Sequence, residues 1–586
     1  MTVASPTAEL VVEVDGRRLT GLSHWAPGPA AAVIVSWGDH ATEADKTACW
    51  ERWSSTIRAA MASLSWPEPK RWRRSAGARE VWCASAPIDR LYAAVALVES
   101  VAGGGDVDAA LSAARGEEDL EGDAAMLAWQ RWAERHQVPY LWCDDYVSVG
   151  HGHRSRTWSR AELPQTPEDD LVSELGTVPT AIITGTNGKT TTSRLLNRIL
   201  ASDGLCVGAT GTDGLVVADE VIDAGDWTGP GGARVILRRP EVEAAVLEAA
   251  RGGMLRRGLG LVDVDASAVT NVSDDHLGEW GIDTVTDMAS VKLLVARAVR
   301  PGGRFVYFDD GATLTQVFDG AGPQVEVLRY CDRPPSEATA GAAGRLAAWI
   351  EADPDEVPTL VVDCGAPDAQ GSPRPALRIS ARDVPISVGG AARYNVANAL
   401  CAALLARGMG ASDAAIRDGL RRFTPTATDS PGRCNLLTYH GARVLLDFGH
   451  NPDGLRRVAE MASNLPARRR LVVTGQAGDR TDDEIAGLVR GLLHCRPDRW
   501  ILKAMPKYAR GRAPNEVISV LRGALKAADV SEEQISDWPS EASAVEAALS
   551  MLQEGDLLLL FIQADAAGAL DALKRAGAVE GWSDDD

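Results

Sequence analysis

The stretch Ile183-Thr-Gly-Thr-Asn-Gly-Lys-Thr-Thr-Thr192 decides the fold, because its glycine-rich turn joins an apolar run to a helical pattern. The preceding Ala181-Ile182-Ile183 predicts a buried strand, and Lys189–Leu200 places its leucines and isoleucine on one helical face. Backbone N–H groups of such a turn can bind an anion at the helix N-terminus. Lys189 can reach the β- and γ-phosphates of a nucleotide, and the Thr190 hydroxyl can hold Mg²⁺.

This stretch is a shortened P-loop, because Ile183 stands where the common pattern has a glycine. The alternative is a glycine-rich turn that binds no ligand. The strand, the loop, the lysine, the hydroxyl and the helix all agree with a nucleotide-binding loop instead. We therefore expect ATP or a close relative to be bound. The expected contacts are Gly185, Thr186, Asn187, Gly188, Lys189, Thr190 and Thr191.

Length and composition set the frame for this expectation. The 586 residues predict three or four domains at roughly 150 residues each. The net charge of −21 argues against nucleic-acid and acidic membrane partners. Nine cysteines without a Cys-x-x-Cys pair predict free thiols in a reducing compartment. With no secretory signal and no apolar run near about 18 residues, the sequence predicts a cytoplasmic protein.

The chain divides into three predicted domains of α/β class: residues 1–170, 171–428 and 429–586. The first is a mixed α/β domain that, extended to about residue 175, holds 11 of the 17 tryptophans, which either fill its core or line a binding face. In the second, strands expected at 180–184, 243–248, 266–271 and 304–308 alternate with helices such as 285–299. This alternation predicts a parallel sheet covered on both faces. Residues 331–380 read as irregular, and a third, Rossmann-like αβ set follows Pro431-Gly-Arg433.

Polar side chains follow the predicted strands of the central domain. Glu248 ends one strand, where a carboxylate can complete the Mg²⁺ shell begun by Thr190, unless it faces solvent. His276 lies in the polar loop Asn271-Val-Ser-Asp-Asp-His-Leu-Gly278, which either holds a second cation or merely caps a strand end. Lys292 lies on the next helix, and taken alone it reads as a solvated lysine.

The C-terminal domain repeats this placement. Asp447-Phe-Gly-His-Asn-Pro-Asp-Gly454 lies between a strand and a helix, and Pro452 suits a first helical turn. Asp447 can bond a ribose or fix a neighbouring loop, whereas His450 and Asn451 are otherwise ordinary turn residues. Gly478-Asp-Arg480 and Lys503 also fall at strand ends, so several ends point to one crevice.

These motifs resemble those of the Mur ligases, and within that superfamily those of the Mur-like half of cyanophycin synthetases. The resemblance covers roughly residues 175–570. The motifs that carry it are Gly185–Thr190, Glu248, Asn271…His276, Asn395…Asn398, Pro431-Gly-Arg433 and Asp447…Pro452, with Gly225-Asp-Trp-Thr-Gly-Pro230 and Ala250-Arg-Gly-Gly-Met-Leu-Arg-Arg-Gly-Leu259.

The N-terminal part extends the resemblance. Val138–Arg156 is similar to the segment that joins the N-terminal domain of cyanophycin synthetases to an ATP-grasp domain. Here the P-loop follows within about 35 residues, too few for an ATP-grasp fold. The chain therefore resembles a cyanophycin synthetase without that module, and a separate ATP-grasp ligase is a conceivable partner.

The resemblance implies a ligase that uses ATP and Mg²⁺ and forms an acyl phosphate. It implies that Lys189, Glu248, His276 and Lys292 are catalytic, that Thr190, Glu248 and His276 bind cations, and that CO₂ carbamylates Lys292. It further implies that Asn398 contacts adenine and that Arg433 and Asp447 bind ATP, with His450 and Asn451 beside them.

The substrates implied are an amino acid or amine and a peptide-like acceptor. Arginine as the amine is in doubt, because Lys503-Ala-Met-Pro-Lys-Tyr-Ala509 replaces the acidic stretch that precedes Arg-Gly-Arg in that family. A folylpolyglutamate-type glutamate ligase and a non-catalytic nucleotide-binding partner remain as alternatives. The resemblance also leaves a homo-oligomer open.

Overall fold

The computed structural model describes residues 11–275, 277–318, 320–322, 324–351, 357–363, 375–513 and 515–582. The chain forms two compact units. Unit 1 comprises Met1–Tyr330, Ala338–Ala347 and Ala403–Ala415. Unit 2 comprises Cys331–Glu337, Ala348–Ala402 and Ile416–Asp586.

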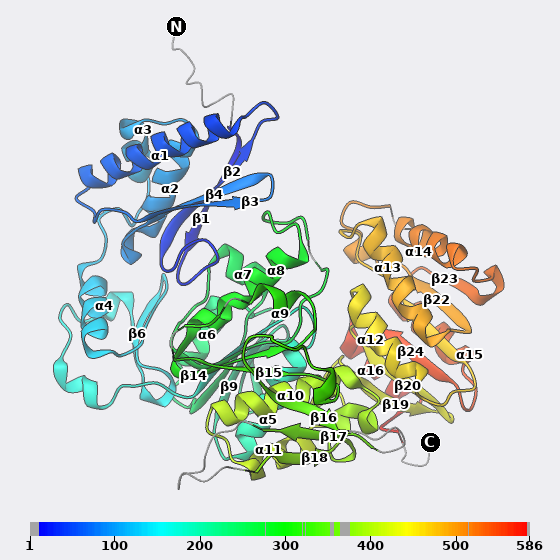
Figure 1. Cartoon of the computed structure of the whole chain (residues 1–586). Coiled ribbons are helices and arrows are strands. Elements are labelled where there is room, and N and C mark those ends of the chain that lie inside the picture. Colours follow the sequence, from blue (N-terminus) through cyan, green and yellow to red (C-terminus); the bar gives the residue numbers. More distant parts are fainter. Residues whose placement is uncertain are drawn as a thin grey trace. The chain divides into compact units, whose positions relative to one another are not determined.

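Unit 1 begins with an antiparallel sheet in the order β1-β2-β4-β3. Its strands are β1 (Val11–Leu19), β2 (Ala30–Trp37), β3 (Arg71–Ala76) and β4 (Arg79–Ser85). Successive β2 side chains face opposite ways: Val33 joins a core with α1 (Glu43–Ser63), α2 (Leu91–Ala102) and α3 (Val107–Ala114), whereas Ala32 and Ile34 join the core of the next sheet. Figure 1 shows α1 and α2 beside this sheet. A small sheet, β5 (Tyr140–Trp142), β6 (Tyr146–Val149) and β7 (Arg156–Ser159), follows α4 (Ala124–His136).

The P-loop belongs to a third sheet, whose strands in unit 1 run in the order β11-β10-β9-β12-β8-β13-β14-β15. The six strands from β9 to β15 in this order are parallel, whereas β10 and β11 pair antiparallel at one edge. The strands are β8 (Thr180–Thr184), β9 (Val207–Gly211), β10 (Gly214–Val217), β11 (Glu220–Ala224), β12 (Ala244–Glu248), β13 (Val264–Val269), β14 (Val299–Phe308) and β15 (Glu326–Tyr330). The helices between them are α5 (Lys189–Ser202), α6 (Pro230–Leu237), α7 (Arg251–Arg256), α8 (Val285–Lys292) and α9 (Thr313–Val317).

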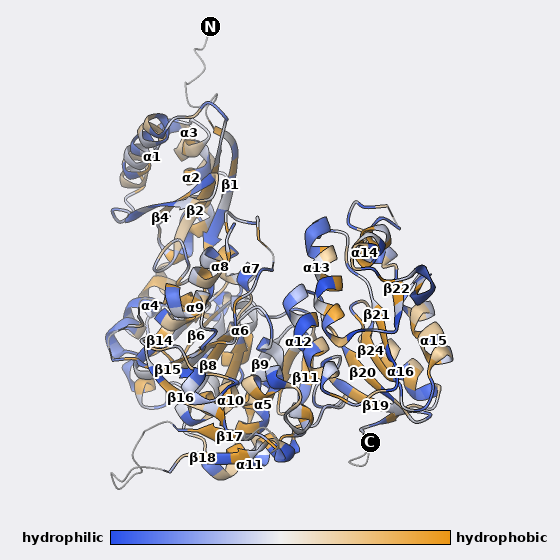
Figure 2. Ribbon diagram, turned by 45° about the vertical axis from the view of Figure 1, so that its right-hand side comes forward, coloured by the Kyte–Doolittle hydropathy of each residue, from blue (hydrophilic) through white to orange (hydrophobic). Residues whose placement is uncertain are grey.

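Unit 2 contains a second mostly parallel sheet, in the order β23-β22-β21-β24-β20-β19-β25, of which the first five strands are parallel. Its strands are β19 (Asn435–Tyr439), β20 (Ala442–Asp447), β21 (Arg470–Thr474), β22 (Arg499–Lys503), β23 (Ile535–Trp538), β24 (Leu557–Phe561) and β25 (Val579–Glu580). Its helices are α12 (Pro452–Ser463), α13 (Asp482–Leu492), α14 (Glu516–Ala527), α15 (Glu541–Met551) and α16 (Ala566–Arg575). All five residues of β24 are buried, and Figure 2 shows this strand as hydrophobic.

Several elements agree with the sequence-based expectations, and three differ. The expectation of an irregular region over 331–380 is wrong for its described residues, because they hold the antiparallel strands β16 (Arg345–Glu351), β17 (Thr359–Val362) and β18 (Leu377–Ser380). These strands are short and separated by Pro- and Gly-rich segments, which hides their alternation. The strand expected at 266–271 is β13, two residues earlier. The helix expected over 285–299 is α-helical only to Lys292 and then tightens into a 3₁₀ turn over Leu293–Ala298.

Helix α10 (Arg393–Gly408) precedes α11 (Asp413–Arg422). None of the eleven N-terminal tryptophans is exposed, which favours the core interpretation over a binding face. No helix of the described residues is long and apolar enough to cross a membrane. The boundaries of the three expected domains stay predictions.

Candidate functional site

The turn between β8 and α5 has the backbone geometry expected of a phosphate-binding loop. Gly188 precedes α5 with a φ of 83°, a left-handed conformation that suits glycine. A Cβ at Gly185 would lie 1.8 Å from the Thr270 hydroxyl oxygen, so only glycine fits there. Within this turn, Lys189 Nζ donates to the carbonyl oxygens of Gly185 and Thr186, at 3.0 Å each.

Thr190 and Glu248 come together beside this loop, as the sequence predicts. The Thr190 hydroxyl lies 3.3 Å from Glu248 Oε1 and 3.4 Å from the Thr212 hydroxyl. Glu248 is 2% exposed, so the solvent-facing alternative for it is wrong. The contact follows from topology, because β12 pairs with β8 in parallel and sets Glu248 opposite Ile183. Thr191 is also buried in the first turn of α5.

Thr270 and Asn271 hold the P-loop from the end of the neighbouring strand β13. Asn271 Oδ1 accepts from the Asn187 amide at 2.9 Å, and Asn271 Nδ2 donates to the Asn187 carbonyl at 2.9 Å. The Thr270 hydroxyl donates to the same carbonyl at 2.6 Å, and the Thr186 amide donates to the Asn271 carbonyl at 2.9 Å. The sequence singled out Asn271 only as part of a cation loop, and Thr270 not at all. His276 lies outside the described residues.

Lys292 is not the solvated lysine that its position on a helix indicates. It ends α8 with 4% of its surface exposed. Burial lowers the pKa of Lys292 well below its usual 10.5; Lys189 and Arg251 act in the same direction, and Asp275 opposes them. A buried lysine with a lowered pKa carries a larger fraction of neutral, nucleophilic amine.

A recess opens beside Glu248. It is lined by Ile182, by Leu247–Ala249, by Thr228–Pro230 with Ala233, and by Met254 with Gly258–Leu261. Thr228–Pro230 end the motif Gly225–Pro230, and Met254, Gly258 and Leu259 belong to the motif Ala250–Leu259. The recess therefore borders the carboxylate with mainly apolar groups.

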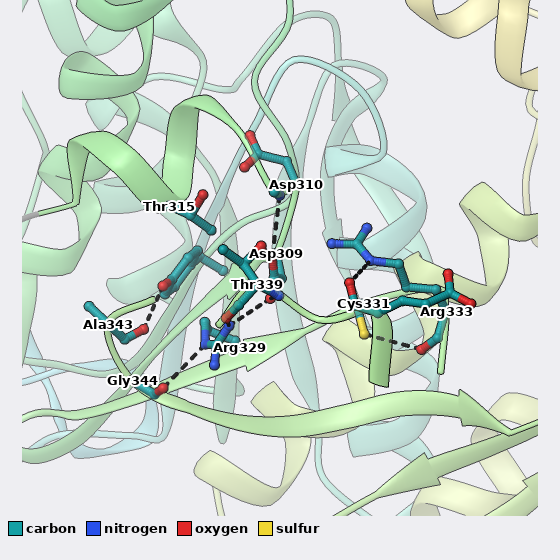
Figure 3. Close-up of polar contacts among 12 residues, drawn as sticks. Asp309, Asp310, Thr315, Arg329, Cys331, Arg333, Thr339, Ala343 and Gly344 are labelled. Atoms are coloured by element: carbon teal, nitrogen blue, oxygen red, sulfur yellow. Dashed lines mark hydrogen bonds and ion pairs between the residues drawn. The ribbon is translucent and has the colours of Figure 1, made fainter. Parts of the chain in front are cut away.

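Asp309, at the end of β14, belongs to a closed polar network (Figure 3). Its carboxylate accepts from Arg329 at 2.6 Å and from the Thr339 amide at 3.0 Å. Arg329 also donates to the Thr339 carbonyl at 2.9 Å and to the Gly344 carbonyl at 3.2 Å. These hydrogen bonds fix the segment 339–344. Because Arg329 already neutralises the Asp309 carboxylate, we assign Asp309 no ligand.

In unit 2, Asp447 ends β20 and fixes two loops. Its carboxylate accepts from the Cys434 amide and from the Gly449 amide, both at 2.8 Å. Burial raises the pKa of Asp447 above its usual 3.8, although Arg433 and the two amides oppose this. The Arg433 guanidinium lies 4.1 Å from the Phe448 ring centre.

The loop after β20 is held by Asn451 and by two glutamines that the sequence did not indicate. Asn451 caps α12, since its side chain accepts from the Gly454 amide at 2.8 Å. The His450 carbonyl accepts from Gln476 at 2.6 Å, and the Gly449 carbonyl accepts from Gln563 at 2.7 Å. Both glutamines follow parallel strands whose carboxyl ends meet here.

Two further residues named from the sequence are buried in unit 2. Asn398, on α10, donates to Asn395 at 3.1 Å. Lys503 ends β22, pairs with Glu541 and donates to Gln563 at 2.6 Å. Burial lowers the pKa of Lys503 to about 8, and Glu541 opposes the shift.

Across the parts of the chain that the structure describes, no group of three or more His, Cys, Asp or Glu side chains is arranged to hold a metal. A cation at Thr190 and Glu248 would therefore draw further oxygen ligands from phosphate and water. This suits Mg²⁺, which usually keeps several waters and takes one or two carboxylates.

Comparison with known proteins identifies the family. The model of the Mur ligase middle domain matches residues 183–406, and that of the Mur ligase glutamate ligase domain matches residues 432–561. The chain belongs to the Mur ligase superfamily.

Its relatives include cyanophycin synthetases, as the motifs indicated. It is 35% identical over 425 residues to that of Synechocystis sp., which covers 71% of this chain and 46% of the relative. For that of Crocosphaera subtropica the identity is 36% over 388 residues, covering 66% and 42%. The chain thus spans about half the length of these curated relatives.

Other known proteins resemble the chain at lower identity. The UDP-N-acetylmuramyl-tripeptide synthetase of Leifsonia xyli is 26% identical over 385 residues, covering 64% of this chain and 69% of the relative. Among solved structures, E. coli FolC in complex with DHPP and ADP is 20% identical, with a TM-score of 0.49, covering 68% of this chain and 89% of that one.

Proposed function

We propose that the protein is an ATP-dependent, ADP-forming ligase that joins an amine to a carboxylate through an acyl phosphate. The observation that carries this proposal is the buried pair of Thr190 and Glu248 beside the Lys189 P-loop. The family supports it, because Mur ligases share these motifs.

The reaction has two steps. An acceptor carboxylate oxygen takes the γ-phosphoryl group of ATP, which releases ADP and leaves an acyl phosphate. The amine nitrogen then attacks the acyl carbon, the carbon–oxygen bond to phosphate breaks, and the amine loses a proton. Carboxylate and triphosphate are both anionic, so positive charge must be placed between them.

The residues of unit 1 suit this task. Lys189 exchanges its bonds to the Gly185 and Thr186 carbonyls for bonds to phosphate oxygens, because an ammonium group forms a stronger hydrogen bond with a charged acceptor. Thr190 and Glu248 hold Mg²⁺, with His276 as ligand of a second cation. When bound, the cation supplies charge neutralisation for phosphoryl transfer.

Lys292 fits the carbamylation that the family resemblance implies. Only a neutral amine attacks CO₂, and burial favours the neutral form of Lys292. The carbamate would turn a buried amine into a carboxylate-like ligand for the cation site.

The family resemblance adds further nucleotide contacts to this proposal. Arg433 and Asp447 bind the nucleotide, and Asn398 contacts its adenine. His450 and Asn451 complete the loop, with Asn451 acting mainly through the helix cap that it forms.

The stretch from Lys503 to Arg512 bears on the amine substrate, which need not be arginine. In the Lys503–Ala509 stretch, Lys503 is buried and paired with Glu541. Arg512 donates to the Gly478 carbonyl at 3.0 Å and to the Arg480 carbonyl at 2.6 Å, so it fixes the 478–480 turn. We propose an amino acid or amine as one substrate and a peptide-like acceptor as the other.

The test is phosphate release from ATP and Mg²⁺ across a matrix of amino acids and acceptors, with products weighed by mass spectrometry. Acceptors include β-Asp-Arg peptides, poly-aspartate and folate, and Lys189→Ala is the inactive control. Release that needs both partners, with an adduct one water lighter than their sum, supports ligation. Activity confined to folate and glutamate would favour the folylpolyglutamate alternative. Tight ATP binding without acceptor-dependent release would favour a non-catalytic partner of a separate ATP-grasp ligase.

A further inference from the structure

One short segment of the N-terminal part of unit 1 contacts the residues that line the recess. Residues 20–26, which we call the strap, follow β1 and run along residues 254–261, which we call the wall. The Thr20 amide donates to the Arg257 carbonyl at 2.8 Å, and the Leu259 amide donates to the Leu22 carbonyl at 2.7 Å. The Trp25 indole N–H donates to the Leu255 carbonyl at 3.2 Å. The strap thus bonds the wall at three points.

The backbones of the strap and the wall lie close together, without side chains between them at two glycines. A Cβ on Gly21 would lie 2.1 Å from the Leu259 carbonyl oxygen. Gly258 has a φ of +81°, and its Cβ would lie 2.7 Å from the Leu22 carbonyl oxygen. Neither position accepts a side chain without displacing backbone, so the contact is built from glycines on both sides.

Apolar burial reinforces these bonds. Leu22 and Trp25 are 6% and 3% exposed, and they share one hydrophobic cluster with Met254, Leu255 and Leu259. Met254 and Gly258–Leu261 of the wall also line the recess beside Glu248. The wall therefore joins the N-terminal part directly to the residues that line the recess.

A second contact holds the turn Gly278–Ile282, which follows the segment that binds the P-loop. The Arg17 guanidinium on β1 lies 4.8 Å from the Trp280 ring centre. A Cβ on Gly281 would lie 2.1 Å from the Ala76 carbonyl oxygen of β3. Arg251 at the start of α7 pairs with Glu279, which ties this turn to the helix whose last residues begin the wall.

We infer that the N-terminal part is a fixed component of the ligase site, which positions the wall and the 278–282 turn for the acceptor. Trp25 is the main positioning residue, because it joins both the hydrogen bonds and the apolar cluster. The expected effect on acceptor binding rests on the proposed function. The expected effect on the order of the wall rests on the contacts alone.

The test compares Trp25→Phe with Trp53→Phe. Trp53 is a matched control, because it is fully buried in the same part of unit 1 and its indole donates to the Val98 carbonyl at 3.1 Å. It belongs to the cluster on the helical side of the sheet, which excludes the wall. Both variants keep an aromatic ring and lose one N–H donor.

Hydrogen–deuterium exchange of peptides covering residues 254–261 gives a readout that needs no ligation. We expect Trp25→Phe to speed exchange there by at least about fivefold, the effect of losing a hydrogen bond. Trp53→Phe should leave these peptides at the wild-type rate and speed exchange near Val98. Wall exchange that is unchanged in Trp25→Phe, or raised equally in both variants, would overturn the inference.

Kinetics then test the consequence for the site. Trp25→Phe should raise the acceptor KM by at least about fivefold and leave the ATP KM within about twofold, whereas Trp53→Phe should change neither. A ligase whose acceptor KM ignores Trp25→Phe would contradict the positioning role. If no ligation is found with any substrate, the proposed function fails, but the exchange result still decides the inference.

Discussion

Replacing Asn271 with alanine tests the arrangement that holds the P-loop. The substitution removes two side-chain hydrogen bonds to the backbone of Asn187, both 2.9 Å long. The backbone bond from the Thr186 amide to residue 271 would remain. The loop should therefore lose order around Asn187 without losing its chain path.

The magnitude follows from those two bonds. Each contributes about 0.5–1.5 kcal/mol net, so both contribute about 1–3 kcal/mol. If nucleotide binding requires the ordered loop, the cost appears as weaker affinity, by about 5- to 150-fold. Asn271→Asp should bind more weakly still, because it loses the Nδ2 donor and adds a negative charge near the phosphates.

Isothermal titration calorimetry with ADP and Mg²⁺ measures this affinity directly. Thr42→Ala is the control: it removes the capping box of α1, where Thr42 accepts from the Asp45 amide at 3.2 Å. That loss costs about 0.5–2 kcal/mol of stability and should leave nucleotide affinity unchanged. An Asn271→Ala protein that binds ADP within about twofold of wild type would refute the reasoning.

Three further predictions address charge. Glu248→Gln should raise the Mg²⁺ concentration needed for nucleotide binding by at least about tenfold, because the carboxylate loses its charge; an unchanged Mg²⁺ titration would contradict the assignment. In ¹³C-bicarbonate, the ¹³C NMR spectrum of the wild-type protein should show a carbamate resonance that Lys292→Met lacks, because burial favours the neutral amine of Lys292. Equal spectra for the two proteins would show that Lys292 is not carbamylated. The pKa of Lys503 is lowered to about 8, so between pH 8 and 10.5 the native state has lost a proton that the unfolded chain keeps. The free energy of unfolding should then rise with pH in this window, by up to about 3 kcal/mol relative to a Lys503→Met/Glu541→Gln double variant, as urea denaturation would measure. A pH-independent difference between the two proteins would show that Lys503 titrates normally.

The sequence predicts local features of this protein well. The P-loop, β8 and α5 are contiguous, so the apolar run, the glycines and the helical spacing suffice to place Lys189 and Thr190. Glu248 is also placed correctly, because a residue that ends a parallel strand lies at the ligand-binding edge of the sheet.

Contacts between distant segments could not be predicted in this way. Asn271 and Asn187 are 84 residues apart, and only the neighbouring positions of β8 and β13 bring them together. The burial of Lys292 depends on what α8 packs against, which helical spacing does not show. The strap and the wall meet through glycines about 240 positions apart, which the sequence marks only as turn residues.

Asn451 shows a different limit. A polar residue before a proline at a helix start fits a cap and a ligand equally well. The structure shows the cap, and the role of Asn451 toward a nucleotide stays a prediction. The sequence does not predict the short strands β16, β17 and β18, because four to seven residues show too little alternation of apolar and polar side chains to distinguish a strand from a loop.

The central claim is that the acceptor carboxylate takes the γ-phosphoryl group of ATP. An acceptor with ¹⁸O in its carboxylate, turned over with its amine partner, ATP and Mg²⁺, tests this claim most directly. If an acyl phosphate forms, one ¹⁸O atom passes from the carboxylate to the released phosphate, and mass spectrometry of that phosphate detects it. Phosphate that carries no ¹⁸O would show that water, and not the acceptor, receives the phosphoryl group, and the proposed ligase mechanism would be wrong.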